Sequence, residues 1–222
     1  MLEKIVLVDI CGTLYDSNTT FDFLDFHFKG KFNYKCFRKI SKTYLWRLGN
    51  KISFQFFSLD LTRIIAIKWL RGFSKEQLKK MSVVFYDDFL ADRIQKEVID
   101  EIDILRSEQT RILLVSATLD FIAETVSERM QIPEYYSTKL YYTQKGVCEG
   151  KIDVDLLSVK NSYLIENNIC PPYYWTITDN LSDIDLIKNS LNSTIVVPSK
   201  YKTKWDYLIN KYDIKNFKII CF

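Results

Sequence analysis

Three polar residues in this chain follow short apolar runs and could take part in chemistry. Asp9 ends KIVLVD, Ser116 follows RILLV, and Asp179 ends YYWTITD. Such runs are typical of buried strands. Because ligands gather at the carboxyl ends of parallel strands, we expect the three side chains to meet in one ligand site. A carboxylate such as Asp9, placed before the glycine turn of VLVDICGTLYD, can act as a nucleophile.

The elements that must position these residues alternate between strands and helices, which predicts an α/β fold with a parallel sheet and crossover connections. The segment 135–143 alternates and predicts a strand pair with the segment after Gly146. The remaining predicted strands cover 4–9, 111–118, 173–179, 193–198 and 217–222, and the predicted helices cover 119–130, 158–167, 182–191 and 205–212.

Residues 17–108 have a different pattern, with apolar residues at spacings of three and four and no convincing strand. This pattern predicts about four or five helices inserted after the first strand. We therefore divide the chain into a Rossmann-like α/β core, residues 1–16 and 109–222, and an all-helical insertion, residues 17–108.

The composition excludes several classes of protein. The five cysteines are scattered without a C-x-x-C pair, which argues against a disulfide framework or a zinc site and favours a reducing cytosol. The start does not resemble a signal peptide, and no uncharged apolar run has the length of a membrane span. We expect a soluble, cytoplasmic protein. His27 is the only histidine, and we expect it to be structural or at the surface, which removes Ser-His-Asp and Cys-His catalysis.

Four motifs in order resemble those of the haloacid dehalogenase superfamily. They are Asp9-Ile10-Cys11-Gly12-Thr13, Ser116, Lys160, and the run 178–183 with Asp179 and Asp183. The insertion after the first motif and the approach to Lys160 are most similar to the phosphoserine-phosphatase-like branch. The resemblance spans essentially the whole chain, and it implies that the insertion is a cap over the site.

The resemblance also implies a mechanism. Asp9 would attack phosphorus and form an aspartyl-phosphate. Mg²⁺ would bind to Asp9, the main-chain carbonyl of Cys11, Asp179 and Asp183. Lys160 would neutralise developing charge and orient Asp9. The substrate-binding residues would be Thr13, Ser116, Ala117 and Asn180.

Other interpretations of these residues stay open. Ser116 could be only the N-cap of the following helix. Asp179 and Asp183 could be an Asp turn and a helix-start charge. Lys145 and Lys151 are alternatives to Lys160 as the third-motif lysine.

Cys11 departs from the family pattern, because phosphatases of this family carry a second aspartate there as general acid and base. Such help is typically worth about 10²–10⁴ in rate. A thiol is a poor substitute, since its unperturbed pKa is about 8.5. Tyr15, Asp16 or a side chain of the insertion could supply the proton instead, or the substrate could have a leaving group that needs none.

The insertion is basic, since residues 28–80 hold 14 Lys and Arg against the two acids Asp60 and Glu76. The plain interpretation is a helical bundle with a solvated basic face. The more specific interpretation is that this face recognises an anionic partner. The candidates are a lipid phosphate or an anionic membrane surface reached peripherally, and a phosphosugar or nucleotide-linked sugar. Nucleic acid is disfavoured, because no binding module accompanies the charge.

We thus predict a Mg²⁺-dependent phosphatase acting on a small phosphorylated metabolite or a phosphoanhydride through Asp9. The alternatives are a non-catalytic phospholigand-binding or membrane-associated protein on the same scaffold, and a C–X hydrolase of the dehalogenase or phosphonatase type.

Overall fold

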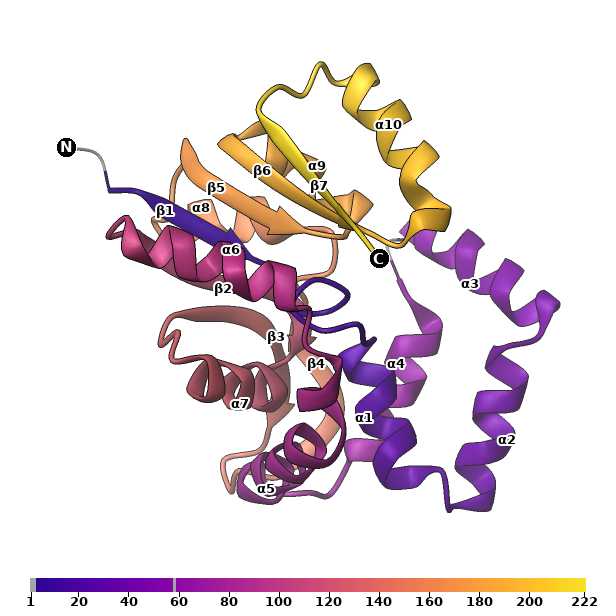
Figure 1. The fold of residues 1–222 in the computed structure, drawn as a ribbon. Coiled ribbons are helices and arrows are strands. Elements are labelled where there is room, and N and C mark those ends of the chain that lie inside the picture. Colours follow the sequence, from indigo (N-terminus) through magenta and orange to yellow (C-terminus); the bar gives the residue numbers. More distant parts are fainter. Residues whose placement is uncertain (1–2, 58) are drawn as a thin grey trace.

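A seven-stranded sheet forms the centre of the molecule (Figure 1). The computed structural model describes residues 3–57 and 59–222, and the strand order is β4-β3-β2-β1-β5-β6-β7. All neighbouring strands pair in parallel except β3 and β4, which are antiparallel. This confirms the predicted α/β class. The strands are β1 (Ile5–Val8), β2 (Arg111–Leu119), β3 (Tyr135–Tyr142), β4 (Cys148–Val154), β5 (Tyr173–Thr178), β6 (Ser190–Val197) and β7 (Phe217–Cys221).

The helices that follow the strands agree with the predicted ones, with one correction. They are α7 (Asp120–Met130), α8 (Lys160–Glu166), α9 (Ile184–Lys188) and α10 (Lys202–Lys211). The helix expected over 182–191 already ends at Lys188, and β6 begins at Ser190. The reason is pairing in the sheet, since Ser190 lies opposite Tyr173 and its hydroxyl bonds to that of Thr176 at 2.6 Å.

The segment after β1 is helical, as predicted. It contains α1 (Thr19–Phe28), α2 (Phe32–Ser41), α3 (Tyr44–Phe57), α4 (Leu61–Ile67), α5 (Lys75–Phe85) and α6 (Lys96–Ser107), joined partly by short 3₁₀ and π turns. The described residues thus form six α-helices here, more than the expected four or five. The chain breaks before α6 because the main chain of Gln95 bonds to Leu14, and Ile94 pairs with Tyr15.

Helix α6 lies against the sheet (Figure 1), where Glu101 forms an ion pair with Lys218 of β7. The division of the chain at residues 16/17 and 108/109, which assigned α6 to the insertion, stays a prediction.

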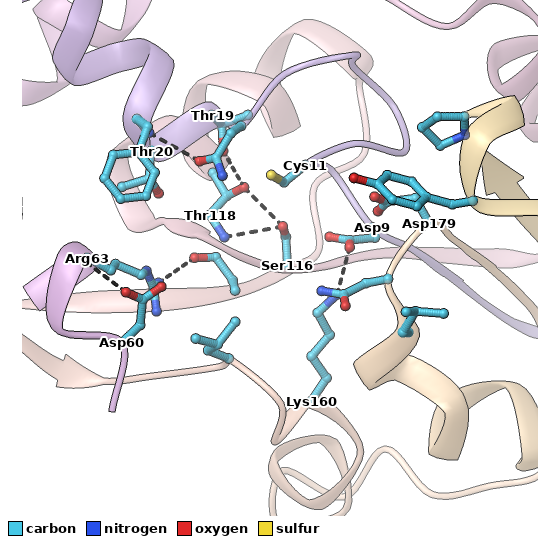
Figure 2. A pocket seen from close by; sticks show the side chains of 18 of the residues that line it. Asp9, Cys11, Thr19, Thr20, Asp60, Arg63, Ser116, Thr118, Lys160 and Asp179 are labelled. Carbon is cyan, nitrogen blue, oxygen red and sulfur yellow. Dashed lines mark hydrogen bonds and ion pairs between the residues drawn. The ribbon is translucent and has the colours of Figure 1, made fainter. Parts of the chain in front are cut away.

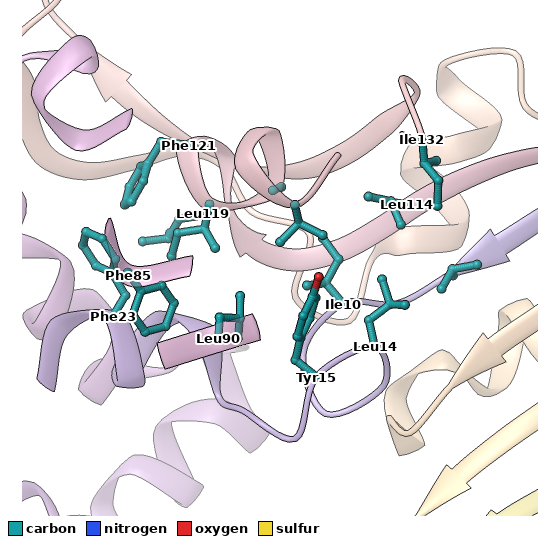
Figure 3. Packing of buried hydrophobic residues seen from close by; sticks show 14 of the residues in the cluster. Ile10, Leu14, Tyr15, Phe23, Phe85, Leu90, Leu114, Leu119, Phe121 and Ile132 are labelled. Carbon is teal, nitrogen blue, oxygen red and sulfur yellow. The ribbon is translucent and has the colours of Figure 1, made fainter. Parts of the chain in front are cut away.

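An aromatic cluster joins the insertion to the core (Figure 3). Phe23 of α1 is fully buried and packs edge-on against Phe85 of α5, with ring centroids 5.5 Å apart, and against Phe121 of α7, at 5.0 Å. Edge-to-face pairs of this kind stabilise a core beyond their buried area. Among the described helices, none is both long and apolar enough to cross a membrane.

Truncation of Phe23 should test this junction. We expect Phe23→Ala to lower the free energy of unfolding by about 3–5 kcal/mol, because it leaves a cavity among packed rings. Urea denaturation measures the change. The matched control is Phe32→Ala, whose ring is 77% exposed and whose loss should cost no more than about 0.5 kcal/mol. Equal effects of the two variants would contradict the assignment.

Candidate active site

Asp9 lies directly after β1, at the carboxyl edge of the sheet. Its main-chain N–H donates to the carbonyl of Ile177 at 2.9 Å, which continues the pairing with β5. Its side chain is 4% exposed and accepts a hydrogen bond from the N–H of Ile10 at 2.7 Å. The sheet therefore fixes both the position and the orientation of this carboxylate.

The turn after Asp9 brings Thr13 against Asp179. The Thr13 hydroxyl donates to an Asp179 carboxylate oxygen at 2.9 Å and accepts from the N–H of Asp179 at 2.8 Å. Gly12 has a φ of +75°, and a Cβ there would lie 2.3 Å from an Asp179 oxygen. Glycine is required here for both reasons. Thr13 therefore holds the carboxylate of Asp179, and its expected contact with substrate stays a prediction.

Lys160 begins helix α8 and joins two carboxylates. Its Nζ lies 2.8 Å from Asp9 and 2.7 Å from Asp183, and all three side chains are buried. The Thr178 hydroxyl donates to the same Asp183 oxygen at 2.7 Å. Among the three lysines considered from the sequence, Lys160 is the one at this site, whereas Lys151 pairs with Glu149.

The electrostatics of this cluster favour a cation. Burial raises the pKa of Asp179, and the nearby Asp9 carboxylate raises it further. Burial also raises the pKa of Asp183, although Lys160 opposes the shift. Burial alone would lower the pKa of Lys160, but Asp183 and Asp9 raise it above its usual value. Three carboxylates against one ammonium leave a negative excess when all are ionised.

The donor chemistry suits Mg²⁺, which prefers carboxylate and carbonyl oxygens. One buried oxygen of Asp183, Oδ1, has no hydrogen-bond partner, so it is free to accept a ligand or a metal-bound water. Within the described residues, no group of three acidic, cysteine or histidine side chains is already arranged around a metal position. The residues thus fit the ion in type and charge, and Lys160 bridges two of them.

Cys11 lines the cavity beside Asp9, and its thiol is engaged in a hydrogen bond to the main chain. Its Sγ donates to the main-chain carbonyl of Ser17 at 3.2 Å. Burial raises the pKa of the thiol to about 12, and the carboxylates of Asp9 and Asp179 contribute. A thiol with this pKa is protonated at neutral pH.

Ser116 belongs to a chain of hydroxyls that reaches the insertion (Figure 2). Its hydroxyl is buried and bonds to that of Thr118 at 3.0 Å, which in turn lies 2.8 Å from that of Thr19 in α1. The register of β2 against β3 shifts between Ser116 and Leu119, and such bulges redirect side chains. Ser116 is not the N-cap of α7, a position that Leu119 holds.

Two further predicted substrate residues, Ala117 and Asn180, line the cavity over the site. The Asn180 side chain accepts from the N–H of Ser182 at 3.0 Å and so caps a short turn. The carbonyl of Ala117 accepts from Arg63 at 2.6 Å. Whether either contacts substrate stays a prediction.

The cavity has a volume of about 490 Å³ and opens over Asp9, Cys11, Ser116, Lys160 and Asp179. Sequence reasoning brought these five residues together correctly. The sequence analysis did not identify the other residues that line the cavity, which come from α1, from the start of α4, and from the C-terminal segment. The missed lining residues include Asn18, Thr19, Thr20, Asp60, Arg63, Thr118, Tyr201 and Lys204.

Arg63 is the most consequential of the missed residues. It is 5% exposed, lies 2.5 Å from Asp155, and donates to the Thr138 hydroxyl at 2.9 Å. These contacts, with the one to Ala117, tie α4 to β2, to the middle of β3 and to the residue after β4. An arginine inside the apolar helix LTRIIAI is the signal that could have revealed it, because a buried charge requires partners.

His27 takes no part in the site. It packs against Phe23 and Phe26, and its Nε2 lies 3.0 Å from the carbonyl of Met81. Burial lowers the pKa of its imidazole. The expectation of a structural histidine is confirmed.

Comparison with known proteins agrees with this geometry. The family model of the haloacid dehalogenase-like hydrolases matches residues 6–188. The chain therefore belongs to the haloacid dehalogenase-like hydrolase family. A search of curated protein sequences finds no match.

Several solved structures share the fold. A protein with unknown function from Bordetella pertussis Tohama I matches with a TM-score of 0.74 at 14% identity, covering 99% of each chain. A substrate-bound phosphoserine phosphatase matches with a TM-score of 0.60 at 15% identity, covering 97% of this chain and 100% of the other. Cytosolic 5'-nucleotidase IIIB bound to cytidine matches with a TM-score of 0.59 at 11% identity, covering 98% and 80%. These structures share the fold that the resemblance in the sequence implies.

Removal of the Arg63 side chain should loosen α4 from the core. We expect Arg63→Met to lower the free energy of unfolding by about 2–3 kcal/mol, because buried oxygens lose their donors. Hydrogen exchange of the α4 amides should accelerate, and urea denaturation gives the stability. The control is Arg47→Met on the exposed face of α3, which should leave both unchanged. Unaltered exchange in Arg63→Met would refute the anchoring role.

Proposed function

We propose that this protein is a Mg²⁺-dependent phosphohydrolase that acts through an aspartyl-phosphate on Asp9. The observation that carries the proposal is the buried Asp9–Lys160–Asp183 cluster, with Lys160 at 2.8 and 2.7 Å from its partners. Asp9 and Lys160 line the cavity of about 490 Å³, whereas Asp183 lies outside its lining. A fixed carboxylate beside an ammonium is suited to attack an anionic phosphoryl group.

In the first step a carboxylate oxygen of Asp9 forms a bond to phosphorus, while the bond from phosphorus to the leaving oxygen breaks. In the second step water attacks the same phosphorus, the bond to Asp9 breaks, and inorganic phosphate and a proton are released. Lys160 holds Asp9 in place and stabilises the charge that spreads over the phosphoryl oxygens. Ser116 would donate a hydrogen bond to one of these oxygens in place of the one that it donates to the Thr118 hydroxyl at 3.0 Å.

Mg²⁺ would be held by Asp9, Asp179, Asp183 and the main-chain carbonyl of Cys11. When bound, it offsets the repulsion between the carboxylate nucleophile and the anionic substrate. Thr13 supports this set, because its two hydrogen bonds fix Asp179. Thr178 does the same for Asp183.

Which substrates can be hydrolysed depends on whether a side chain at the cavity can give a proton to the leaving group. Tyr15 is fully buried, bonds to Tyr86, and lies outside the cavity lining, while Asp16 is exposed and also lies outside it. Asp60 lines the cavity, but it lies on the side away from Asp9 (Figure 2) and caps α4 through the N–H of Arg63. Tyr15 and Asp16, considered from the sequence as proton donors, are therefore not placed for this task.

We infer that the preferred substrates have leaving groups that need no proton, such as an acyl phosphate or a phosphoanhydride. A stable leaving group removes the requirement for an acid at position 11, where the thiol has a pKa of about 12. The cavity volume of about 490 Å³ suits a small phosphorylated metabolite.

The C–X hydrolases receive less support. The resemblance implies that a phosphonate-cleaving member of the family would need a lysine of the cap as an imine-forming amine. The described insertion residues that line the cavity include no lysine. The hydroxyls of Ser116, Thr118 and Thr19, together with Lys160, suit the oxygens of a phosphoryl group better than a halide. The non-catalytic alternative is decided by the experiment that follows.

Asp9→Asn should abolish turnover. We expect phosphate release from acetyl phosphate and from p-nitrophenyl phosphate, with Mg²⁺, to fall by at least about 10³-fold, because an amide cannot be the nucleophile. The control is Asp16→Asn, which is exposed and should retain wild-type rates. Wild-type protein that releases no phosphate with either substrate would support the non-catalytic alternative.

Cys11→Asp should change the dependence on the leaving group. We expect wild-type kcat/KM to fall steeply from p-nitrophenyl phosphate to an alkyl phosphate, whose alkoxide needs a proton. Cys11→Asp should raise the alkyl phosphate rate by about 10²–10⁴-fold and affect the aryl substrate much less. Cys11→Ser is the control for size and should leave the steep dependence in place. Equal rates for both substrates in the wild type would show that another acid is present.

A further inference from the structure

Helices α2 and α3, with the turn before them, form an arm that stands away from the sheet (Figure 1). We define the basic arm as residues 29–57. None of the side chains of α3 is buried, although the helix has 14 residues and many are apolar. A helix of this composition ordinarily buries one apolar face against a neighbour. In this structure the apolar face of α3 has no such neighbour to bury it.

An apolar stripe runs along α3. Leu45, Leu48, Ile52 and Phe56 are 80%, 42%, 48% and 72% exposed. Their spacing of three and four places them on one face of the helix. Tyr44 beside them is 76% exposed. Contiguous exposed apolar surface marks a contact site in soluble proteins.

The basic arm also carries a strong, uniform charge. It contains eight Lys and Arg and no Asp or Glu. Arg38 pairs with Asp25 at 2.7 Å. The other seven cations are exposed, and none has an ion-pair partner in the part of the chain that the structure describes: Lys29, Lys31, Lys35, Lys39, Lys42, Arg47 and Lys51.

We propose that the basic arm docks on the surface of an anionic phospholipid bilayer. Helices that lie in a membrane interface combine an apolar face with flanking Lys and Arg, and anionic headgroups attract each cation. Arg47 and Lys51 are exposed and, at helical spacing, lie one turn apart along one side of the stripe. A second copy of the chain fits the arm poorly, because an isologous contact would bring the two sets of cations together. Nucleic acid would neutralise the cations but leave the stripe in water.

The basic arm is joined to the cavity wall, so docking would hold the cavity near the bilayer. Trp46 donates its indole N–H to the Thr62 hydroxyl at 2.9 Å, and Asn50 accepts from the N–H of Thr62 at 3.0 Å. Thr62 lies in α4 between Asp60 and Arg63, which line the cavity. The docking itself requires no turnover, and it can be tested apart from the hydrolase activity.

Co-sedimentation with vesicles tests the proposal. We expect the protein to bind vesicles of phosphatidylcholine mixed with phosphatidylglycerol at low salt, and not vesicles of phosphatidylcholine alone. Leu45→Ser/Phe56→Ser should abolish the binding. Arg47→Gln/Lys51→Gln should weaken it about tenfold or more, because each cation near an anionic surface contributes. The matched controls outside the arm, Ile104→Ser/Leu191→Ser and Lys139→Gln/Lys145→Gln, should bind as the wild type does.

Absence of wild-type binding to the mixed vesicles at low salt would overturn the proposal, as would equal binding by the arm variants and their controls. Sedimentation of the free protein as a dimer that Leu45→Ser/Phe56→Ser dissolves would assign the stripe to a second copy instead. Phosphate release from p-nitrophenyl phosphate, measured for the same variants, should stay at wild-type rates. Loss of vesicle binding is therefore distinguishable from loss of the hydrolase activity.

Discussion

The ammonium of Lys160 between the carboxylates of Asp9 and Asp183 is the interaction on which the rest of the site depends. A buried lysine is very costly unless its charge is paired, and removal of one partner leaves an uncompensated buried charge. Lys160 is 3% exposed and its two partners are equally enclosed. The end of β1, the first residue of α8 and the turn after β5 must therefore meet at one point. Parallel pairing of β1 with β5 makes this possible.

The other polar side chains of the site lie in two sets on either side of the Asp9–Lys160–Asp183 cluster. Asp179 and Asp183 form the acidic side, and their hydrogen bonds come from Thr13 and Thr178. The hydroxyls of Ser116 and Thr118 form the neutral side and continue to Thr19 of the insertion. A cation suits the first side and phosphoryl oxygens suit the second. Under the proposed function, the insertion contacts the site on the side that would receive the substrate, and it would take part in selecting the substrate.

Much of this arrangement could be predicted because it depends on local rules. Asp9, Ser116 and Asp179 follow strands whose apolar runs are evident, and parallel strands bring their carboxyl ends together. Arg63 could not be placed, since its pairing with Asp155 spans 92 positions of the sequence. The exposure of α3 could not be predicted from the sequence either, because the helical periodicity is the same whether the apolar face is buried or exposed. The early start of β6 depends on its pairing with β5. The intrinsic strand propensity of the residues does not predict this pairing.

The structure also explains how the fold accommodates Cys11. The loop after Asp9 is closed by main-chain bonds, from Gly12 to the carbonyls of Tyr15 and Ser17 at 3.0 and 3.1 Å, and Gln95 donates to the carbonyl of Gly12 at 2.9 Å. None of these bonds involves the side chain at position 11, and the thiol adds one more to Ser17. A second carboxylate there would join three others around a single lysine and would add repulsion. A cysteine at this position therefore leaves the main-chain bonds of the loop intact and adds no charge to the cluster.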